Sequence, residues 1–426
     1  MYIHIKNGRV IDPKNNMDSQ QDVFISTGKI ASLGIAPPAF KADKTIDASN
    51  LIICPGLVDL SARLREPGDE HKASLISELQ AAVAGGVTSL ACPPDTDPVL
   101  DEPGLVEMLK YRAKQQGLAH VYPLGATTRR LEGKALSEMS ELQTAGCVGF
   151  SQVNHAIVDT QVLWRAMEYA ATFGYTLFFH AEEPFLAKDG VAHDGEVATR
   201  LGLKGIPSAA EALALASILR IAQETGAKVH ISRLSTAEGV AMIRAAKAQG
   251  LNITCDVSAN QLHLTEHDIA YFDAQCHLKP PVRAQRDKEA ISAGLKDGTI
   301  DAICSDHTPV DDDAKLVPFA EAEIGATGLE LLLSLLLKWA QQDKVSLLKA
   351  ISLVSQHPAN ILGISAGCLS VGSEADICIF DALGYWKVQA SALKSQGKNT
   401  PFIGLEMTGK VKFTLVNGKV VYQTIS

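Results

Sequence analysis

The chain has 426 residues and a formal net charge of −9, from 39 lysines and arginines against 48 aspartates and glutamates. Apolar residues make up 46% and charged residues 20%, an ordinary globular composition that excludes a disordered chain. The acidic balance argues against nucleic acid or an anionic membrane surface as a partner. No apolar run approaches the roughly 18 residues of a membrane span, so no membrane partner is predicted.

Two features of the sequence predict a cytoplasmic protein. The N-terminal residues alternate as in a strand and lack the long apolar stretch of a signal peptide. The 8 cysteines form no CxxC pair, so neither a zinc ribbon nor a redox motif is expected. We interpret the cysteines as small buried residues of a protein in a reducing compartment.

The two ends of the chain predict strands. Residues 1–53 read as short strands broken by turns, with Asn7-Gly8 as a hairpin signal. Residues 366–426 show the same pattern, and Asn417-Gly418 separates the last two strand-like runs. Because chain termini often lie close together, we predict one small β-sandwich domain made from both segments.

The middle of the chain, residues 54–365, predicts a separate barrel domain. Apolar strand-like runs alternate here with amphipathic helical stretches, which favours a parallel sheet covered by helices. Eight such units fit an α/β fold of the (β/α)8 barrel type, and no GxGxxG follows the first strand to support a dinucleotide fold. The predicted strands are 51–60, 87–94, 120–127, 147–153, 176–182, 228–235, 252–259 and 301–306.

A series of motifs resembles the dihydroorotase family of the amidohydrolase superfamily. They include PGLVDLSARLREPG at 55–68, FFHAEEP at 178–184, LKPPVR at 278–283 and DGTIDAICSDHTP at 297–309. The motifs follow in order along nearly the whole chain, which makes the resemblance specific. It implies an amidohydrolase-type barrel with a β-sandwich built from both termini, and a divalent metal site at the barrel mouth.

The resemblance also implies where metal ligands would stand, and most of these positions are altered. The family's His-x-His after the first strand, its histidine after the sixth strand and its aspartate on the fourth strand are all replaced. The altered positions are Ser61, Arg63, Arg233, Gln152 and Val153. Of the family's metal-site set, only His180 and Asp306 remain.

The positions that the family uses for its substrate are altered as well. Arg65, which meets the substrate carboxylate in the family, is present, and its alternative partner here is a neighbouring acid such as Asp95. Asp95 and Lys279 replace two asparagines, and Val310 replaces a histidine. These changes alter the charge of the pocket, so dihydroorotate would not bind in the same way.

Physical chemistry makes the arginines the decisive change. Arginine stays protonated and has no lone pair for a metal. A cation about 4 Å from a dication costs roughly 8 kcal/mol at an effective dielectric near 20. We therefore expect no metal and no catalytic residue, with His180, Asp306 and Arg65 as vestiges. Our hypothesis is that one guanidinium, from Arg63 or Arg233, occupies the metal position and pairs with Asp306.

The remaining histidines are interpreted as structural or solvated. His230 and His307 are expected to face away from the barrel mouth, in structural roles. His263, His267 and His277 show no ligand spacing and are assigned to loops. His71 and His193 are expected to be solvated.

The pattern of losses resembles one class of dihydroorotase relatives. This class is the non-catalytic dihydroorotase-like chain that assembles with the catalytic chain of bacterial aspartate transcarbamoylase. The resemblance implies the same role for this protein. The sequence thus favours a pseudoenzyme over an enzyme: an assembly subunit of a hetero-oligomer in pyrimidine biosynthesis, with a homodimer as an alternative for the chain alone.

Two other functions stay open. One is a divergent, metal-dependent dihydroorotase or cyclic amidohydrolase, which would need zinc and a base such as Glu182 beside His180. The other is a ligand-sensing module in which four cations form an anion pocket at the barrel mouth. Those four are Arg63, Arg65, Arg233 and Lys279.

Overall fold

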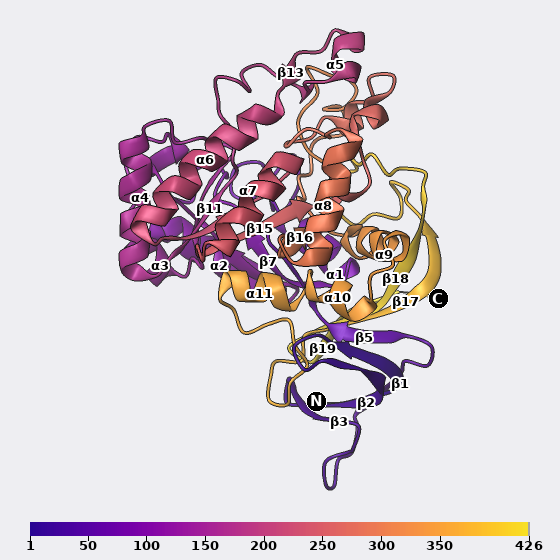
Figure 1. Ribbon diagram of the computed structural model, residues 1–426. Coiled ribbons are helices and arrows are strands. Elements are labelled where there is room, and N and C mark those ends of the chain that lie inside the picture. Colours follow the sequence, from indigo (N-terminus) through magenta and orange to yellow (C-terminus); the bar gives the residue numbers. More distant parts are fainter. Residues whose placement is uncertain (425–426) are drawn as a thin grey trace.

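The computed structural model describes residues 1–424. Figure 1 shows a helix-covered barrel in the upper part of the molecule and a sheet that contains both ends of the chain below and beside it. The barrel is made by the middle of the chain, as the alternating pattern predicts.

The first and last strands form one eight-stranded sheet with the order β19-β18-β17-β5-β1-β2-β3, in which β4 also pairs with β1. β5 joins the two ends of the chain, because it pairs with β1 on one side and β17 on the other. The sheet has its own hydrophobic core, which confirms the separate terminal β domain. Its strands are β1 (Tyr2–Asp12), β2 (Met17–Ser26), β3 (Lys29–Leu33), β4 (Lys44–Asp47), β5 (Ile52–Pro55), β17 (Ile377–Lys387), β18 (Glu406–Val416) and β19 (Lys419–Gln423).

The barrel strands are parallel and follow one another in chain order, which confirms the (β/α)8 fold. A parallel bridge between Ala62 and His307 joins the end of the first strand to the end of the last and closes the ring. The strands are β6 (Leu57–Asp59), β7 (Val87–Cys92), β8 (His120–Pro123) with β9 (Gly125–Ala126), β10 (Phe150–Val153), β11 (Thr176–Phe179), β14 (Lys228–Ile231), β15 (Ile253–Ser258) and β16 (Ala302–Cys304).

Helices cover the outside of the barrel, and side chains cap several of their N-termini. Ser74 forms a capping box at α1, and the Asp159 and Thr236 side chains cap α4 and α7. The α-helices are α1 (Leu75–Ala84), α2 (Pro103–Gln116), α3 (Met139–Ala145), α4 (Thr160–Phe173), α5 (Glu196–Leu201), α6 (Ser208–Thr225), α7 (Ala237–Ala248), α8 (Gln285–Asp297), α9 (Leu332–Gln342), α10 (Leu347–Ser352) and α11 (Gln356–Leu362).

Short elements lie in the loops between these helices and strands. Two short strands, β12 (Ala192–His193) and β13 (Gly205–Ile206), pair with each other beside α5. The 3₁₀ turns are η1 (Arg129–Leu131), η2 (Ala259–Leu262), η3 (Glu266–Ile269) and η4 (Ala274–Cys276). No helix within residues 1–424 is long and apolar enough to cross a membrane.

The predicted strand 51–60 divides at Gly56 into β5 of the terminal sheet and β6 of the barrel. A Cβ atom at Gly56 would lie 2.1 Å from the Thr88 hydroxyl oxygen, so only glycine fits where the chain passes between the two parts. The cysteines are all buried and free, as their interpretation as core residues predicts.

The segment 388–405 leaves the terminal sheet between β17 and β18 and packs on the barrel. The Asn399 amide donates to the carbonyl oxygens of Thr308 and Gly325, at 3.0 Å each. The range 366–426 that we predicted for the terminal domain therefore includes a segment that contacts the loops at the barrel mouth.

Candidate functional site at the barrel mouth

The residues that the sequence singled out meet at the carboxyl ends of the barrel strands. Four of them have positive φ angles: Arg65 at 62°, Val153 at 50°, Arg233 at 58° and Asp306 at 51°. This backbone conformation is uncommon for residues other than glycine, and such residues cluster at functional sites. The chain therefore has the uncommon backbone conformation of a functional site at these positions, although several of its side chains there differ from those of the dihydroorotase family.

Arg63 lies in the mouth and is 7% exposed. Its Nε donates to Asp95 Oδ2 at 2.7 Å, and its Nη1 donates to Thr308 Oγ1 at 2.9 Å. Nη1 is also 3.7 Å from Asp306 Oδ1. Burial alone would lower the pKa of Arg63, but Asp95 and Asp306 outweigh it and raise that pKa. The guanidinium is thus a fixed cation.

Arg233 reaches the same carboxylate from the other side of the mouth. Its Nη1 is 3.3 Å from Asp306 Oδ1 and donates to the Lys279 carbonyl at 3.0 Å. Its Nη2 donates to Asn154 Oδ1 at 2.6 Å, and its backbone N–H donates to Asp256 at 2.6 Å. The hypothesised pairing is confirmed, with the difference that both arginines, rather than one, contact Asp306.

Asp306 is held between these cations and is 7% exposed. Burial raises its pKa above the usual value, and the two arginines only partly offset this effect. Asp95 shows the opposite balance, because the charge and hydrogen bond of Arg63 hold its pKa below the usual value despite burial. Asp306 is therefore occupied by guanidinium contacts at the position where the family carries a metal ligand.

The space left at the centre of the mouth is a cavity of about 20 Å³, bordered by both guanidiniums and by Ser61, Val153 and His180. This volume is near the minimum that one water molecule needs, and far below the ~300 Å³ at which ligand pockets begin. Gln152 does not face this cavity with a free amide, because the amide nitrogen donates to Thr128 Oγ1 and the Leu131 carbonyl, at 2.9 Å each.

His180 keeps one unpaired nitrogen. Its Nδ1 lies 3.4 Å from the Ser232 carbonyl, while its buried Nε2 has no hydrogen-bond partner and is 3.9 Å from Glu182 Oε2. Burial, followed by the charges of Arg233 and Lys279, moves the pKa of His180 well below its usual value, so the ring is neutral near pH 7. Lys279 Nζ binds the other Glu182 oxygen at 2.7 Å.

The donor set at the mouth does not fit the metal that the fold family implies. Within residues 1–424, no group of three or more His, Cys, Asp or Glu side chains could hold a metal ion. His180 and Asp306 remain from the ligand set, and the cations of Arg63 and Arg233 face the same carboxylate. Guanidinium groups cannot donate a lone pair, and their charge repels a dication.

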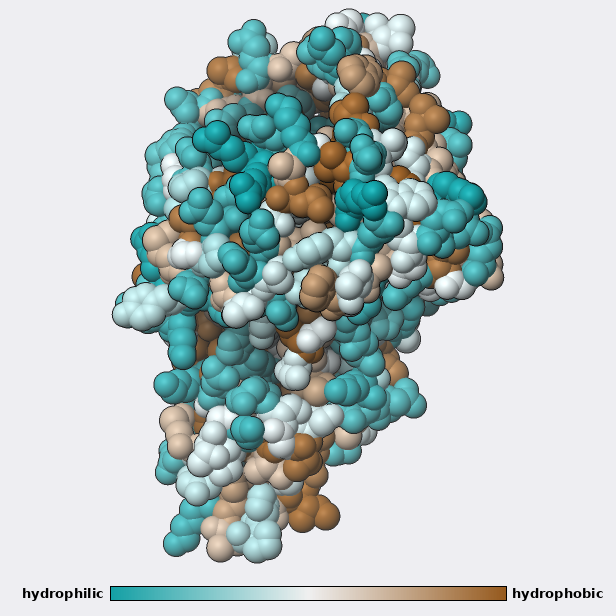
Figure 2. Space-filling model, turned by 90° about the vertical axis from the view of Figure 1, so that its left-hand side faces the viewer, coloured by the Kyte–Doolittle hydropathy of each residue, from teal (hydrophilic) through white to brown (hydrophobic). Residues whose placement is uncertain are grey.

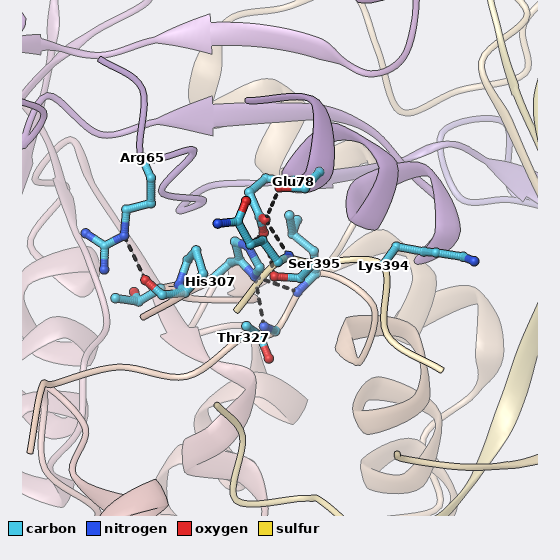
Figure 3. A network of polar contacts seen from close by, with 12 residues as sticks. Arg65, Glu78, His307, Thr327, Lys394 and Ser395 are labelled. Carbon is cyan, nitrogen blue, oxygen red and sulfur yellow. Dashed lines mark hydrogen bonds and ion pairs between the residues drawn. The ribbon is translucent and has the colours of Figure 1, made fainter. Parts of the chain in front are cut away.

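The positions related to substrate binding are occupied by internal contacts. Arg65 Nε donates to the Pro309 carbonyl at 2.8 Å, and Nη1 is 3.5 Å from Asp69 (Figure 3). Arg65 thus pairs with a neighbouring acid as expected, but that acid is Asp69, because Arg63 takes Asp95. The Val310 side chain is buried, and its N–H donates to Asn399 at 3.0 Å.

A buried polar network beside the mouth was not predicted from the sequence (Figure 3). Glu78 of α1 accepts from His307 Nε2 at 2.6 Å, from Ser395 Oγ at 2.7 Å and from Gln396 N at 2.9 Å. His307 Nδ1 in turn accepts from the Gly328 N–H at 3.1 Å. His307 thus has the structural role that we expected, and the network ties the segment 388–405 to the barrel.

Some histidines lie elsewhere than expected. His193 is 5% exposed instead of solvated, because the paired strands β12 and β13 enclose it and Arg283 approaches its Nδ1 at 3.3 Å. His277 is a loop residue but is buried, since its Nδ1 meets the Ala322 carbonyl at 2.8 Å. His230, by contrast, has the structural role that we expected, because it is buried between Thr254 and Asp256, at 2.8 and 3.0 Å.

Asn154 and Thr308 are further site residues that sequence reasoning missed. Both bind the guanidiniums, Asn154 through Arg233 and Thr308 through Arg63. Each stands one or two residues from a position already singled out, Val153 in one case and Asp306 in the other. That proximity was the available signal, but it does not give the direction of a side chain.

The fold and the mouth define an amidohydrolase-type barrel protein. L-hydantoinase (dihydropyrimidinase) from Arthrobacter aurescens superposes with a TM-score of 0.89 at 25% identity, over 99% of this chain and 96% of that chain. Dihydropyrimidinase from Brevibacillus agri superposes with a TM-score of 0.82 at 21% identity, over 99% and 95% of the chains, and supports the fold alone.

The sequence comparisons show the family. Residues 50–239 match the model of the family described as Dihydro-orotase-like. A "Dihydroorotase-like protein" of Pseudomonas aeruginosa is 43% identical over 99% of this chain and 100% of its own length. A "Dihydroorotase" of Geobacter sp. (strain M21) is 41% identical with the same coverage. The chain belongs to the dihydroorotase-like family.

Proposed function

We propose that this protein is a catalytically inactive dihydroorotase homologue that serves as a structural assembly subunit of aspartate transcarbamoylase in pyrimidine biosynthesis. The observation that carries the proposal is the pair of guanidiniums, from Arg63 and Arg233, on the Asp306 carboxylate. By the resemblance they stand at metal-ligand positions, and the cavity that they border has a volume of only about 20 Å³.

The chemistry of amide hydrolysis supports the absence of catalysis. Hydrolysis in this superfamily uses a metal to activate water and to polarise the amide carbonyl. Water that is not bound to a metal has a pKa of about 15.7. Asp306, held by two arginines, cannot replace that activation, and the cavity of about 20 Å³ that the arginines border has no room for a six-membered ring substrate. A neighbouring cavity of about 240 Å³ is lined by His180 and Glu182, but its lining does not include Asp306.

Some relatives are named dihydroorotase and others dihydroorotase-like protein, and the two groups are similarly identical in sequence to this chain. The Pseudomonas putida relative, 42% identical over 99% of each chain, is a "Dihydroorotase-like protein", as is that of Pseudomonas aeruginosa. The Geobacter relatives are named "Dihydroorotase". The names of the relatives therefore do not decide whether this protein is an active enzyme. The side chains at the barrel mouth favour the inactive class.

An assembly role explains why a barrel is kept without its chemistry. The partner that we propose is the catalytic chain of aspartate transcarbamoylase, in a cytoplasmic hetero-oligomer that needs no metal. The test is to co-express the two chains and measure the mass of the complex by light scattering. A stable hetero-oligomer that raises transcarbamoylase activity supports the proposal, and two separate species at micromolar concentration contradict it.

The competing function is a divergent metal-dependent dihydroorotase or cyclic amidohydrolase. The specific observation in its favour is the unpaired His180 Nε2, 3.9 Å from Glu182 Oε2. Dihydroorotate turnover with added zinc distinguishes the two functions. Turnover that disappears in His180→Phe would establish the enzyme, while no turnover in either protein supports the inactive subunit.

A further inference from the structure

A cavity of about 540 Å³, which we call the junction pocket, lies between the barrel and the terminal sheet. It shares no lining residue with the cavity at the barrel mouth. Its walls come from the ends of β17 and β19, from residues 409–411 of β18, from the segment 388–405 and from the start of α9. β17, β18 and α9 lie at the right of Figure 1. Ligand sites are common at such junctions, and this volume is within their usual range.

Three lysines line this pocket. Lys387 is the last residue of β17, Lys394 lies in the segment 388–405, and Lys410 lies on β18. Within residues 1–424, none of the three ammonium groups forms a hydrogen bond or an ion pair with a carboxylate. Lys387 stands opposite Glu406 and Lys410 opposite Asp381 in the β17–β18 ladder, but neither acid lines the pocket. A lining with three lysines and one acid, in a protein of net charge −9, favours an anion.

The one acidic residue in the lining is turned toward the protein. Glu330 accepts hydrogen bonds from the Lys394 N–H, at 2.8 and 2.9 Å to its two oxygens, and from the Ser395 N–H at 3.1 Å. Burial raises the pKa of Glu330 to about 7, so it carries less than a full negative charge at neutral pH. It opposes an anionic ligand only weakly.

Aromatic side chains line the same pocket. Tyr385 is 74% exposed, and Tyr422 of β19 stands at the other side of the lining. Trp386 is fixed by a hydrogen bond from its Nε1 to Ser334 Oγ at 3.0 Å. Aromatic faces beside ammonium groups suit a planar ring that carries phosphate.

We propose that the junction pocket binds a phosphorylated aromatic heterocycle of nucleotide size, with its phosphates at Lys387, Lys394 and Lys410 and its ring against Tyr385, Trp386 or Tyr422. Lysine binds phosphate as a point charge, and stacking on an aromatic ring adds selectivity for a planar base. This site lies apart from the barrel mouth and does not depend on the function proposed above.

Calorimetric titration of the full chain with UTP and ATP at physiological salt tests the proposal. Uridine and inorganic triphosphate serve as probes of the two halves of the ligand. We expect the nucleotides to bind at least about tenfold more tightly than either half, because ring and phosphate contacts act together. No binding of either nucleotide at millimolar concentration, or equal affinity for triphosphate alone, overturns the proposal.

Charge reversal locates the site. We expect Lys387→Glu/Lys410→Glu to weaken nucleotide binding by about tenfold or more, because each change replaces an attraction with a repulsion. The matched control is Lys188→Glu/Lys228→Glu, at two exposed lysines outside the junction pocket, which should bind as the wild type does. Equal loss in both variants would show general charge attraction and overturn the site.

Tryptophan fluorescence gives an independent readout that a change in folding would not imitate. We expect nucleotide to change the emission of the wild type and of Trp164→Phe, and to leave that of Trp386→Phe unchanged. Melting temperatures near that of the wild type establish that the variants fold. A nucleotide-dependent signal that persists in Trp386→Phe contradicts the placement of the ring.

Discussion

At the scale of single residues, the barrel mouth depends on Asp306 and the two arginines that share it. Arg233 lies 3.3 Å and Arg63 lies 3.7 Å from Asp306 Oδ1, and all three side chains are buried. A buried ion pair contributes little net stability, but the loss of one partner leaves a charge without compensation. This arrangement makes the vestigial aspartate a structural residue.

We predict that Asp306→Asn destabilises the protein by about 3 kcal/mol, because Arg63 and Arg233 keep their charges and lose a carboxylate. Urea unfolding measures the change. The matched control is Asp297→Asn, which removes an exposed partner of Arg244 and should cost less than about 1 kcal/mol. Equal stability of Asp306→Asn and the wild type would mean that the cluster contributes nothing.

At the scale of elements, Gly56 marks the point where one apolar run is divided between two structural parts. β5 and β6 flank it, and the Thr88 side chain of β7 fills the space where a side chain would stand. The fold therefore depends on a close approach of backbone and side chain at this point, which a strand pattern alone does not reveal.

Gly56→Ala should destabilise the protein by about 1–3 kcal/mol, since the added methyl group meets the Thr88 hydroxyl at 2.1 Å. Gly104→Ala in α2 is the control, because nothing lies within 4 Å of its Cβ position and alanine favours the helix. Thermal unfolding of both variants checks the prediction. A Gly56→Ala melting temperature at or above that of the wild type would contradict the close packing described here.

The segment 388–405 is a second feature at this scale, and a buried acid makes its attachment depend on pH. Glu330 binds the backbone of Lys394 and Ser395, and its pKa is raised to about 7 from a model-compound value of 4.5. The native state therefore holds this proton more tightly than the unfolded state, so stability from this group falls as pH rises from about 4.5 to 7.

We predict that Glu330→Gln removes this pH dependence, which amounts to at most about 3 kcal/mol between pH 4.5 and 7. Urea unfolding of wild type and variant at several pH values in this window isolates the contribution of Glu330. Glu406→Gln on exposed β18 serves as the control and should follow the wild type. Parallel pH profiles of wild type and Glu330→Gln would refute the assignment.

At the scale of the whole molecule, the sequence predicts the architecture better than the site. Alternating apolar runs and helices, from residues 51–60 to 301–306, give the barrel because strand burial follows local composition. The terminal strands meet in one sheet as expected. Figure 2 shows hydrophobic residues among hydrophilic ones on the face of α4 and α6, and several of them gather in its upper middle.

The site was predictable as a set of positions and not as a set of contacts. The family motifs indicated Arg63, Arg233 and Asp306, and the structure brings them together. That both guanidiniums share one oxygen depends on side-chain directions and on Asn154 and Thr308, which bind them. Such contacts join residues more than 70 positions apart and leave no local pattern in the sequence.

We propose that side chains at the mouth prevent the binding of a catalytic metal. Zinc content, measured by elemental analysis after incubation with zinc and gel filtration, tests it most directly. The positive control is Ser61→His/Arg63→His/Arg233→His, which returns three imidazoles to the mouth beside His180 and Asp306. Adding His180→Phe to this variant should remove the zinc again.

We predict no stoichiometric zinc in the wild type and about one or two ions per chain in the triple variant, because the two cations are gone and nitrogen ligands replace them. Near-stoichiometric zinc in the wild type, accompanied by hydrolysis of dihydroorotate, would contradict an inactive mouth and establish an enzyme that uses other ligands.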